Sequence, residues 1–338
     1  MKQVTALSPS ADLVAYFAGP ASDIYFQRAR DTLAGAGLDA FVAMDFFSSR
    51  AGVLCGVAEA VRLLGTVLDP NQGDEAWALP EGAPMDNKET VLRIRAHYSR
   101  IGVYETALLG MLSSCSGWAT AAREVVDAAN GKRVISFGAR HVHPLIGPVM
   151  EYAAVVGGCA GCATPLGAQL AGLKAPSGTM PHAMIIVFGD TVTAARAFDA
   201  HMPEDVLRIV LVDTFKDEAE EALRVAAALG DRLRGVRLDT PVERGHVTID
   251  LVKEVRARLD QAGHPKVGIF VSGGLSAQRI REFEAAHAPV DSYGVGMSIS
   301  SAPPIAFTAD IKEVGGKPIA KRGRIPGLSP NPRLARVI

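Results

Sequence analysis

The second half of the sequence alternates short apolar runs with amphipathic segments, and this rhythm limits the possible folds more than any other feature. The runs are rich in β-branched and apolar residues and end in Gly, Asp or Ser; they lie at 133–137, 206–213, 235–239, 266–274 and 292–297. Strands that alternate with helices about thirty residues apart predict parallel pairing through right-handed crossovers. A doubly wound sheet and a closed barrel both fit this rhythm. No G-x-G-x-x-G turn follows the first strand, which favours the barrel.

The segments between these runs have the pattern of helices that bury one face. Residues 217–230 carry Ala and Leu on a single stripe and end at Gly230, a residue that commonly stops a helix. Residues 248–259 repeat the pattern, and residues 276–287 open with Ser276, a favourable N-cap. The sequence therefore predicts three helices that pack on the barrel strands.

The first part of the chain does not show this alternation of strands and helices. A length of 338 residues favours two domains, or a barrel with a second domain. We expect an N-terminal α+β sandwich domain at 1–125, joined by the C-terminal segment 305–338, and an incomplete TIM-like α/β barrel at 126–304. The evidence for the sandwich is a mixture of element types: helical pieces at 51–65 and 121–130, a turn-rich β-like stretch at 77–94 and a hairpin around Gly315–Gly316.

Composition narrows the class of function. The formal net charge of −1 gives no basic field for nucleic acid or an anionic membrane. Residues 152–173 carry no charge, but their glycines and proline indicate a buried segment beside a site rather than a membrane span. Four cysteines and no recognisable signal peptide predict a reducing, cytoplasmic location. Cys159 and Cys162 lack a second pair for zinc, so we interpret them as small buried residues.

In parallel α/β folds the ligand lies at the carboxyl ends of the strands, so the residues that follow each strand are the candidates for a site. Acids, arginines, histidines and two glycine-rich turns occupy these positions. They are Phe137, Arg140, His141, His182, Asp213, Lys216, Arg237, Asp239, Ser272, Gly273, Gly274, Gly294 and Gly296.

The two glycine-rich turns, VSGGL and YGVGMS, have a physical interpretation. Glycine lets the backbone approach an anion closely, and free N–H groups at the start of a helix attract phosphate. The alternative is that each is an ordinary turn where glycine relieves strain. For the pair together, phosphate binding is favoured because adjacent phosphate-binding loops are common in barrels.

Three of the polar candidates also have a structural alternative. His182 lies among Ala, Met and Ile at a strand end, where a lone histidine is often structural. Asp213 and Asp239 could cap helices, or could hold ribose hydroxyls or Mg²⁺.

These motifs resemble the nicotinate phosphoribosyltransferase family in its archaeal and bacterial form. The resemblance covers most of the chain and rests on stretches in the family's order: DIYFQRAR, AGVLCG, LPEGAPM, SFGARHVHP, GTMPHAM, VLVDTFKDE, VRLDT, VSGGL and YGVGM. It implies a seven-stranded, incompletely regular α/β barrel with an N-terminal sandwich domain, in a head-to-tail homodimer or higher oligomer with a shared active site.

The resemblance also implies an activity. Members join nicotinate to the ribose of 5-phosphoribosyl 1-pyrophosphate, release pyrophosphate, and couple this to ATP hydrolysis through a phosphohistidine, with Mg²⁺. Carried over by motif, His182 would take the phosphate, and Tyr25 of the partner subunit and Phe137 would enclose the pyridine ring. Arg140 would meet a carboxylate or a phosphate. The remaining implied roles are ribose, pyrophosphate and Mg²⁺ binding by Asp213, Arg237 and Asp239, substrate binding by Thr179, and 5-phosphate binding by Ser272, Gly273, Gly274, Gly294 and Gly296.

Two departures from the family pattern are visible. Ala160 stands where members commonly carry an acid near the pyridine ring, which leaves the base open, and the short C-terminus lacks the Cys-rich metal knuckle of some relatives. The alternatives are a phosphoribosyltransferase for quinolinate, nicotinamide or another base, a non-catalytic protein that binds phosphoribosyl ligands, and an unrelated aldolase or isomerase barrel. Lys216 is the candidate for that last chemistry.

Overall fold

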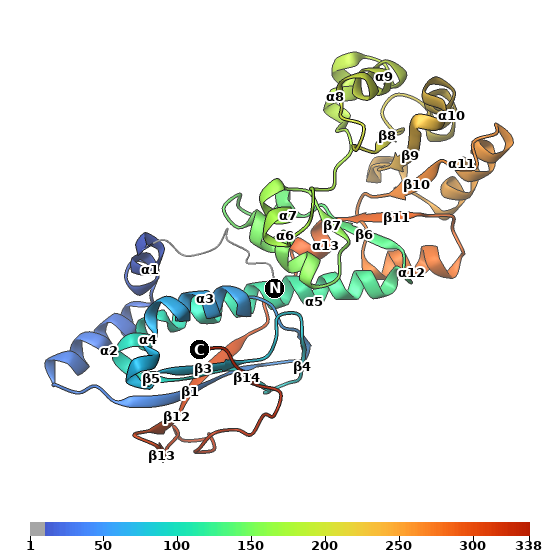
Figure 1. Cartoon of the computed structure of the whole chain (residues 1–338). Helices are drawn as coiled ribbons and strands as arrows, with labels where there is room; N and C mark the ends of the chain where they lie inside the picture. Colours follow the sequence, from blue (N-terminus) through green and yellow to red (C-terminus); the bar gives the residue numbers. More distant parts are fainter. Residues whose placement is uncertain (1–10) are drawn as a thin grey trace. The chain divides into compact units, whose positions relative to one another are not determined.

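The computed structural model describes residues 11–338. The chain divides into two compact units: residues 121–301 form one, and residues up to 120 together with 302–338 form the other. Each has its own sheet (Figure 1). The C-terminal segment adds strands to the sheet of the first unit, as its hairpin pattern indicates.

The first unit is an antiparallel sheet with helices packed on it, which confirms the α+β sandwich. Its sheet has the order β13-β12-β1-β5-β3-β14. The strands are β1 Phe41–Ser48, β3 Glu75–Ala78, β5 Thr90–His97, β12 Phe307–Val314, β13 Lys317–Pro318 and β14 Ala335–Arg336, with β2 Gly52–Val53 and β4 Pro84–Met85 paired separately. The helices are α1 Ala11–Ala18, α2 Ile24–Gly35, α3 Val57–Val67, α4 Tyr98–Ile101 and the first part of α5 Glu105–Ala128.

The apolar stripe of α3 explains how this unit holds together. Ala60, Leu63 and Leu64 are fully buried against the apolar residues of β1 and β5. The sequence pattern predicts a helix over 51–65, but the residues before Val57 instead form β2 and a turn at Gly56. The turn adopts a positive φ there, which ends the strand and starts the helix.

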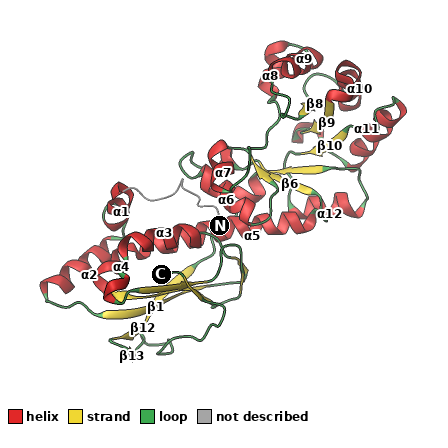
Figure 2. Ribbon diagram, in the orientation of Figure 1, coloured by secondary structure: helices red, strands yellow, loops and turns green. Residues whose placement is uncertain are grey.

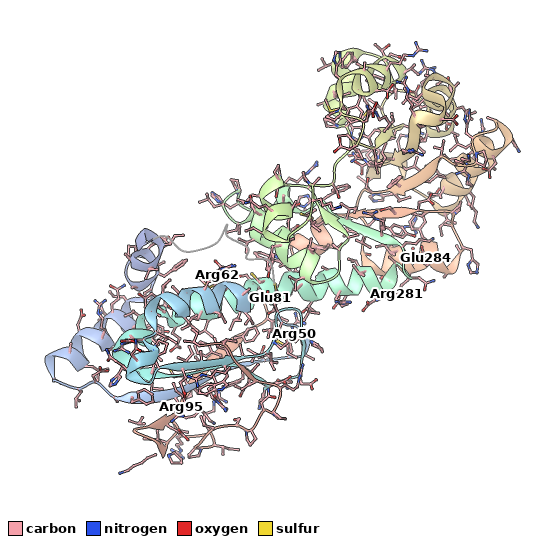
Figure 3. The ribbon with its side chains drawn as sticks, in the orientation of Figure 1. Arg50, Arg62, Glu81, Arg95, Arg281 and Glu284 are labelled. Atoms are coloured by element: carbon pink, nitrogen blue, oxygen red, sulfur yellow. The ribbon has the colours of Figure 1, made fainter. Side chains whose placement is uncertain are left out.

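Glu81 (Figure 3) fixes the start of α3. Its carboxylate accepts hydrogen bonds from the backbone N–H groups of Gly56 and Ala58, both at 2.7 Å. A negative group at this end of a helix satisfies otherwise unpaired donors and complements the helix dipole. The LPEGAPM stretch therefore has a structural role in the first unit.

Gly56 offers a sharp test of this packing. Its φ is +93°, and a Cβ there would lie 2.4 Å from the carbonyl oxygen of Met111. We predict that Gly56→Ala lowers the free energy of unfolding by about 1–3 kcal/mol, because the positive φ is strained for alanine and its Cβ would clash with the carbonyl group of Met111. Urea denaturation followed by circular dichroism measures this change.

The matched control is Gly110→Ala on the exposed face of α5, where a Cβ meets nothing within 4 Å. It should leave stability unchanged or raise it by up to ~1 kcal/mol through helix propensity. Equal effects of the two substitutions would contradict the packing argument.

The second unit is the parallel α/β sheet that the strand–helix rhythm predicts (Figure 2). Its order is β7-β6-β11-β10-β9-β8, and every neighbouring pair is parallel. The strands are β6 Arg133–Ser136, β7 Gly161–Cys162, β8 Arg208–Leu211, β9 Leu233–Leu238, β10 Gly268–Val271 and β11 Ser292–Val295. The expected incomplete barrel is confirmed, although the described residues give six paired strands, not seven, and leave β7 and β8 as edges.

The helices of the second unit follow the strands in the predicted order. They are α6 Gly147–Val156, α7 Pro165–Leu170, α8 His182–Phe188, α9 Thr191–His201, α10 Glu218–Leu229, α11 Ile249–Gln261, α12 Ala277–Ala285 and α13 Met297–Ser300. Ser276 caps α12 by accepting from the N–H of Arg279, and Gly230 ends α10 with a positive φ, both as predicted. Helix α10 is capped by Asp217.

The uncharged stretch 152–173 contributes the end of α6, then β7 and the whole of α7. Cys159 and Cys162 are buried free thiols. Glu151 is fully buried and accepts from the N–H groups of Ala163 and Thr164, which fixes the turn into α7. Within residues 11–338, no helix combines the length and the apolar character that crossing a membrane requires.

Candidate active site at the carboxyl ends of the parallel strands

The carboxyl ends of the parallel strands surround a cavity of about 750 Å³ in the second unit. Ten of the thirteen residues to which the family resemblance assigns a role line it: Phe137, Arg140, His182, Arg237, Asp239, Ser272, Gly273, Gly274, Gly294 and Gly296. Arg237 lies on β9, Gly294 lies on β11 and His182 begins α8, while the others come from the loops after β6, β9, β10 and β11. Parallel pairing brings these loops to one edge because every strand of the sheet ends on the same side.

The other three predicted residues lie outside the lining of this cavity. Asp213 follows β8 and contacts His182, which does line it. Thr179 lines a neighbouring cavity and accepts a hydrogen bond from Arg237 at 2.8 Å. Tyr25 belongs to α2 of the first unit, where its side chain is exposed.

His182 and Asp213 form the most specific contact of the site. The histidine Nε2 lies 2.9 Å from Oδ2 of Asp213, whose side chain is 1% exposed, while the histidine is 38% exposed. His182 is the first residue of α8, and Pro181 is its N-cap. The other oxygen of Asp213, Oδ1, accepts no hydrogen bond within the described residues, so Asp213 does not cap a helix and the structural alternative considered for it is removed.

Asp213 controls the charge of His182. The hydrogen bond to Asp213 raises the pKa of the histidine above its ordinary value, and the negative charges of Asp213 and Asp239 add to this effect. Partial burial and the nearby Arg237 act in the opposite direction. A raised pKa means that the protonated histidine stabilises the folded state. This contribution is fully present at pH values below the ordinary pKa of histidine and is lost as the pH rises through the raised pKa.

We predict that Asp213→Asn lowers the pKa of His182. Burial and the charge of Arg237 lower this pKa, and the substitution removes the carboxylate that chiefly raises it. An NMR titration of the histidine Cε1–H resonance, without metal or nucleotide, measures this pKa. Asp239→Asn is the matched control and should lower the pKa by less, since its charge is the weaker cause. A pKa of His182 that is identical in the wild type and Asp213→Asn would contradict this assignment.

Arg237 links the parts of the site. It lies on β9 with its side chain 14% exposed, and its guanidinium carbon is 5.7 Å from the centroid of the Phe137 ring. Its Nη2 atom lies 3.8 Å from Oδ2 of Asp239. Burial lowers the pKa of Arg237, but an arginine stays charged at neutral pH. A mostly buried cation beside an aromatic ring and a carboxylate is suited to hold an anionic ligand.

The loop after β10 presents backbone donors to the same cavity. Gly273 and Gly274 have φ values of +87° and +65°, a conformation that favours glycine. The N–H groups of Gly273, Gly274 and Leu275 donate to no backbone or side-chain acceptor within residues 11–338. Such a run of free N–H groups is suited to bind an anion.

Asp239 is placed by the start of this loop. Its Oδ1 accepts a hydrogen bond from the Ser272 hydroxyl at 3.0 Å, and a Cβ on Gly273 would lie 2.9 Å from the same oxygen. The following Thr240 donates to the buried Glu218 at 2.8 Å, which fixes the loop after β9. Asp239 therefore does not cap a helix. Its Oδ2 remains available beside Arg237.

Seven further residues line the cavity, and six of them are not singled out by the sequence. The additional lining residues are His141, Pro181, Ala183, Leu275, Met297, Ser298 and Ser301. His141 is one of the strand-end candidates named from the sequence, although the family resemblance assigns it no role, whereas the other six carry no chemical signal in the sequence. Lys216, the candidate for aldolase chemistry, forms an exposed ion pair with Glu220 at 2.9 Å and does not line the cavity.

A second cavity of about 450 Å³ shares Phe137, Arg237, Ser272 and Gly294 with the first. It extends along the strands from Phe137 to Arg133, the first residue of β6, and residues 175–179 form part of its wall. Barrels usually fill this interior with branched side chains, but β11 contributes Ser292 and Gly294. The small side chains leave the interior hollow.

No cluster of three or more His, Cys, Asp or Glu side chains that could hold a metal ion occurs in residues 11–338. Mg²⁺, however, commonly binds through one or two carboxylates together with the phosphates of a substrate. Asp239, with one oxygen available beside a cationic side chain, fits that mode of binding.

The fold and the cavity define an α/β-barrel protein whose site, on the carboxyl rim, is suited to phosphorylated ligands. The chain matches the family model "Quinolinate phosphoribosyl transferase, N-terminal domain" over residues 23–116 and the corresponding C-terminal domain over residues 118–310. The chain therefore belongs to the quinolinate phosphoribosyl transferase family.

Similar proteins carry two kinds of name. The crystal structure of nicotinate-nucleotide pyrophosphorylase from Pyrococcus furiosus is 45% identical, covers 94% of this chain and 81% of its own, and has a TM-score of 0.85. Nicotinate phosphoribosyltransferase pncB2 from Mycobacterium tuberculosis is 34% identical over 228 residues, which are 67% of this chain. This chain spans only about half of that relative, at 48%. The structure of human nicotinic acid phosphoribosyltransferase, 20% identical with a TM-score of 0.72 over 91% of this chain and 77% of its own, shares the fold.

Proposed function

We propose that this chain transfers the phosphoribosyl group of 5-phosphoribosyl 1-pyrophosphate to nicotinate, giving nicotinate mononucleotide and pyrophosphate, with coupling to ATP through His182. The observation that carries this proposal is the His182–Asp213 pair, which opens on the same cavity as Arg237, Asp239 and the Gly273–Gly274 loop. A histidine that can accept phosphate, an acid for Mg²⁺ and a cradle for a phosphate are the parts that such a reaction requires.

Each part of the donor has a complementary group in the cavity. The N–H groups of Gly273 and Gly274 would bind the 5-phosphate. Arg237 would bind the pyrophosphate, and Asp239 would hold the Mg²⁺ that supplies further charge neutralisation. Phe137 would stack on the pyridine ring, and Arg140 would meet its carboxylate.

The chemistry asks the protein to position groups and to stabilise charge. Nitrogen of the pyridine ring attacks the anomeric carbon as the bond to pyrophosphate breaks, through an oxocarbenium-like state. Positive charge from Arg237 stabilises the departing pyrophosphate, and the ring stack holds the attacking nitrogen in line. No side chain has to act as a nucleophile in this step.

ATP coupling would use the ring nitrogen that Asp213 leaves open. Asp213 occupies Nε2 of His182, so Nδ1 is the nitrogen that would attack the γ-phosphorus of ATP and displace ADP. The buried carboxylate would fix the orientation of the imidazole and stabilise the charge that develops on it. Hydrolysis of the phosphohistidine during the cycle would then drive mononucleotide synthesis.

The partner subunit and the compartment complete the proposal. Tyr25 is exposed on the first unit, as a residue that reaches the site of a second copy must be. We propose a homodimer in which Tyr25 of the partner subunit covers the second face of the pyridine ring, in a cytoplasmic enzyme.

The activity is tested by mixing the protein with Mg²⁺, phosphoribosyl pyrophosphate and one base at a time, with and without ATP. We predict nicotinate mononucleotide from nicotinate, with more product when ATP is present. Chromatography of the mononucleotide and release of pyrophosphate both measure the reaction. Absence of product from nicotinate in both conditions would refute the proposed substrate.

The role of His182 has a separate prediction. His182→Ala should abolish stimulation by ATP while retaining part of the ATP-independent transfer, because the histidine takes no part in breaking the glycosidic bond. Incorporation of ³²P from γ-labelled ATP should also disappear. His143→Ala is the matched control, since His143 is exposed and lies outside the cavity lining. Persistent ATP stimulation in His182→Ala would refute the phosphohistidine.

Quinolinate is the second candidate base. The matched family bears its name, and two arginines, Arg140 and Arg237, line the cavity, as a base with two carboxylates would require. A human relative, 29% identical over 72% of this chain, is named nicotinate-nucleotide pyrophosphorylase [carboxylating]. In the same assay, quinolinate as substrate would give nicotinate mononucleotide with release of carbon dioxide and no response to ATP.

A further inference from the structure

Two pairs of glycines lie on the rim of the cavity, and different constraints favour glycine in each pair. Gly273 and Gly274 have positive φ values, so their backbone conformation itself favours glycine. Gly294 and Gly296 do not have positive φ values, and the φ of Gly296 is −110°. The second pair is therefore glycine for a reason other than a positive φ.

That reason is the space taken by two ring side chains. A Cβ on Gly294 would lie 2.4 Å from Cε2 and 2.6 Å from Cδ2 of Phe137. A Cβ on Gly296 would lie 2.7 Å from Cε1 of His141. All three distances are shorter than van der Waals contact allows, so each ring occupies the volume that a side chain would fill.

The loops after β6 and β11 are interlocked at this point. The strands pair in parallel register, and the N–H of Phe137 donates to the carbonyl of Val295 at 2.8 Å. In return, a Cβ on Gly138 would lie 3.0 Å from Cβ of Ser300 and 3.3 Å from the carbonyl oxygen of Gly296. Small residues on both loops therefore let the two loops approach closely and fix where their rings lie.

His141 is oriented further by Ser300. Its Nδ1 lies 3.2 Å from the Ser300 hydroxyl, and that hydroxyl also lies 3.3 Å from the carbonyl oxygen of Gly296. With Nδ1 engaged, Nε2 is the ring nitrogen left for a ligand. His141 lines the cavity beside Arg140 and Gly296, where an anionic ligand would lie.

We propose that Gly294 and Gly296 seat Phe137 and His141, and that His141 is a further binding residue that contacts a phosphoryl oxygen of phosphoribosyl pyrophosphate through Nε2. This inference rests on the proposed function and assigns the YGVGM turn a role other than phosphate binding by its backbone. The Gly273–Gly274 loop is then the phosphate cradle, and the Gly294–Gly296 turn positions one ring for the base and one for the donor.

The first experiment separates the two substrates kinetically. Gly294→Ala should raise the KM for the base roughly tenfold, because it displaces the stacking ring, and should change the KM for phosphoribosyl pyrophosphate less than about twofold. Gly296→Ala and His141→Ala should show the reverse pattern, with a rise of roughly tenfold for phosphoribosyl pyrophosphate. A backbone cradle at Gly294 and Gly296 predicts instead that both glycine variants weaken the donor, and that result would overturn the proposal.

Double variants test whether each glycine acts through its ring. If Gly294 acts by seating Phe137, then Gly294→Ala adds little to the effect of Phe137→Ala on the KM for the base. Likewise, Gly296→Ala adds little to His141→Ala for phosphoribosyl pyrophosphate. His141→Gln, which retains a donor on a longer side chain, should recover part of the affinity that His141→Ala loses. Additive effects within each pair would refute the seating roles.

Two measurements stay informative if no base is turned over. Calorimetry with phosphoribosyl pyrophosphate alone should show a wild-type dissociation constant for Gly294→Ala and a roughly tenfold weaker one for Gly296→Ala and His141→Ala. The crystal structure of Gly294→Ala should show Phe137 in a new rotamer on an unchanged backbone. If no base is turned over but these results are obtained, the proposed base is refuted and the positioning of the rings by the two glycines stands. A Phe137 ring that does not move in Gly294→Ala would refute that positioning.

Discussion

Parallel pairing of β6, β11, β10 and β9 is the constraint on which the rest of the site depends. The strands are in register, so Gly294 lies beside Ile135 and Leu238 lies beside Val271. Their carboxyl ends therefore open on one edge, and the loops that follow bring residues distant in the sequence into one cavity. Helices α10, α11 and α12 bury their apolar stripes next to these strands and hold the register in place (Figure 1).

Charge in the cavity is arranged around a buried carboxylate. Asp213 is 1% exposed, and such a group is costly to bury unless it is paired. His182 supplies the partner, and the same contact raises the pKa of the histidine and orients its ring. One interaction thus pairs Oδ2 of a buried acid, raises the pKa of a partly exposed histidine and leaves Nδ1 as the reactive nitrogen of the proposed function.

Much of this arrangement can be predicted from the sequence, because the period of the apolar residues and the residues that follow each strand are local signals. Five of the six described strands of the second unit, all but β7, follow from them, as do the caps at Ser276 and Gly230 and ten residues that line the cavity. The pairing of Asp213 with His182 does not, because it joins residues 31 apart through the fold.

The role of Gly294 likewise depends on where the Phe137 ring lies. The sequence alone does not distinguish a glycine that relieves backbone strain from a glycine that makes room for a ring. Their distinction requires the φ angles and the distances to neighbouring atoms.

The central claim is that a phosphoribosyl ligand lies on this rim with its ring against Phe137. A crystal structure of the protein with nicotinate mononucleotide tests it most directly. The account predicts the 5-phosphate on the N–H groups of Gly273 and Gly274 and the pyridine ring stacked on Phe137. A mononucleotide bound elsewhere, or with its phosphate away from the Gly273–Gly274 loop, would contradict it.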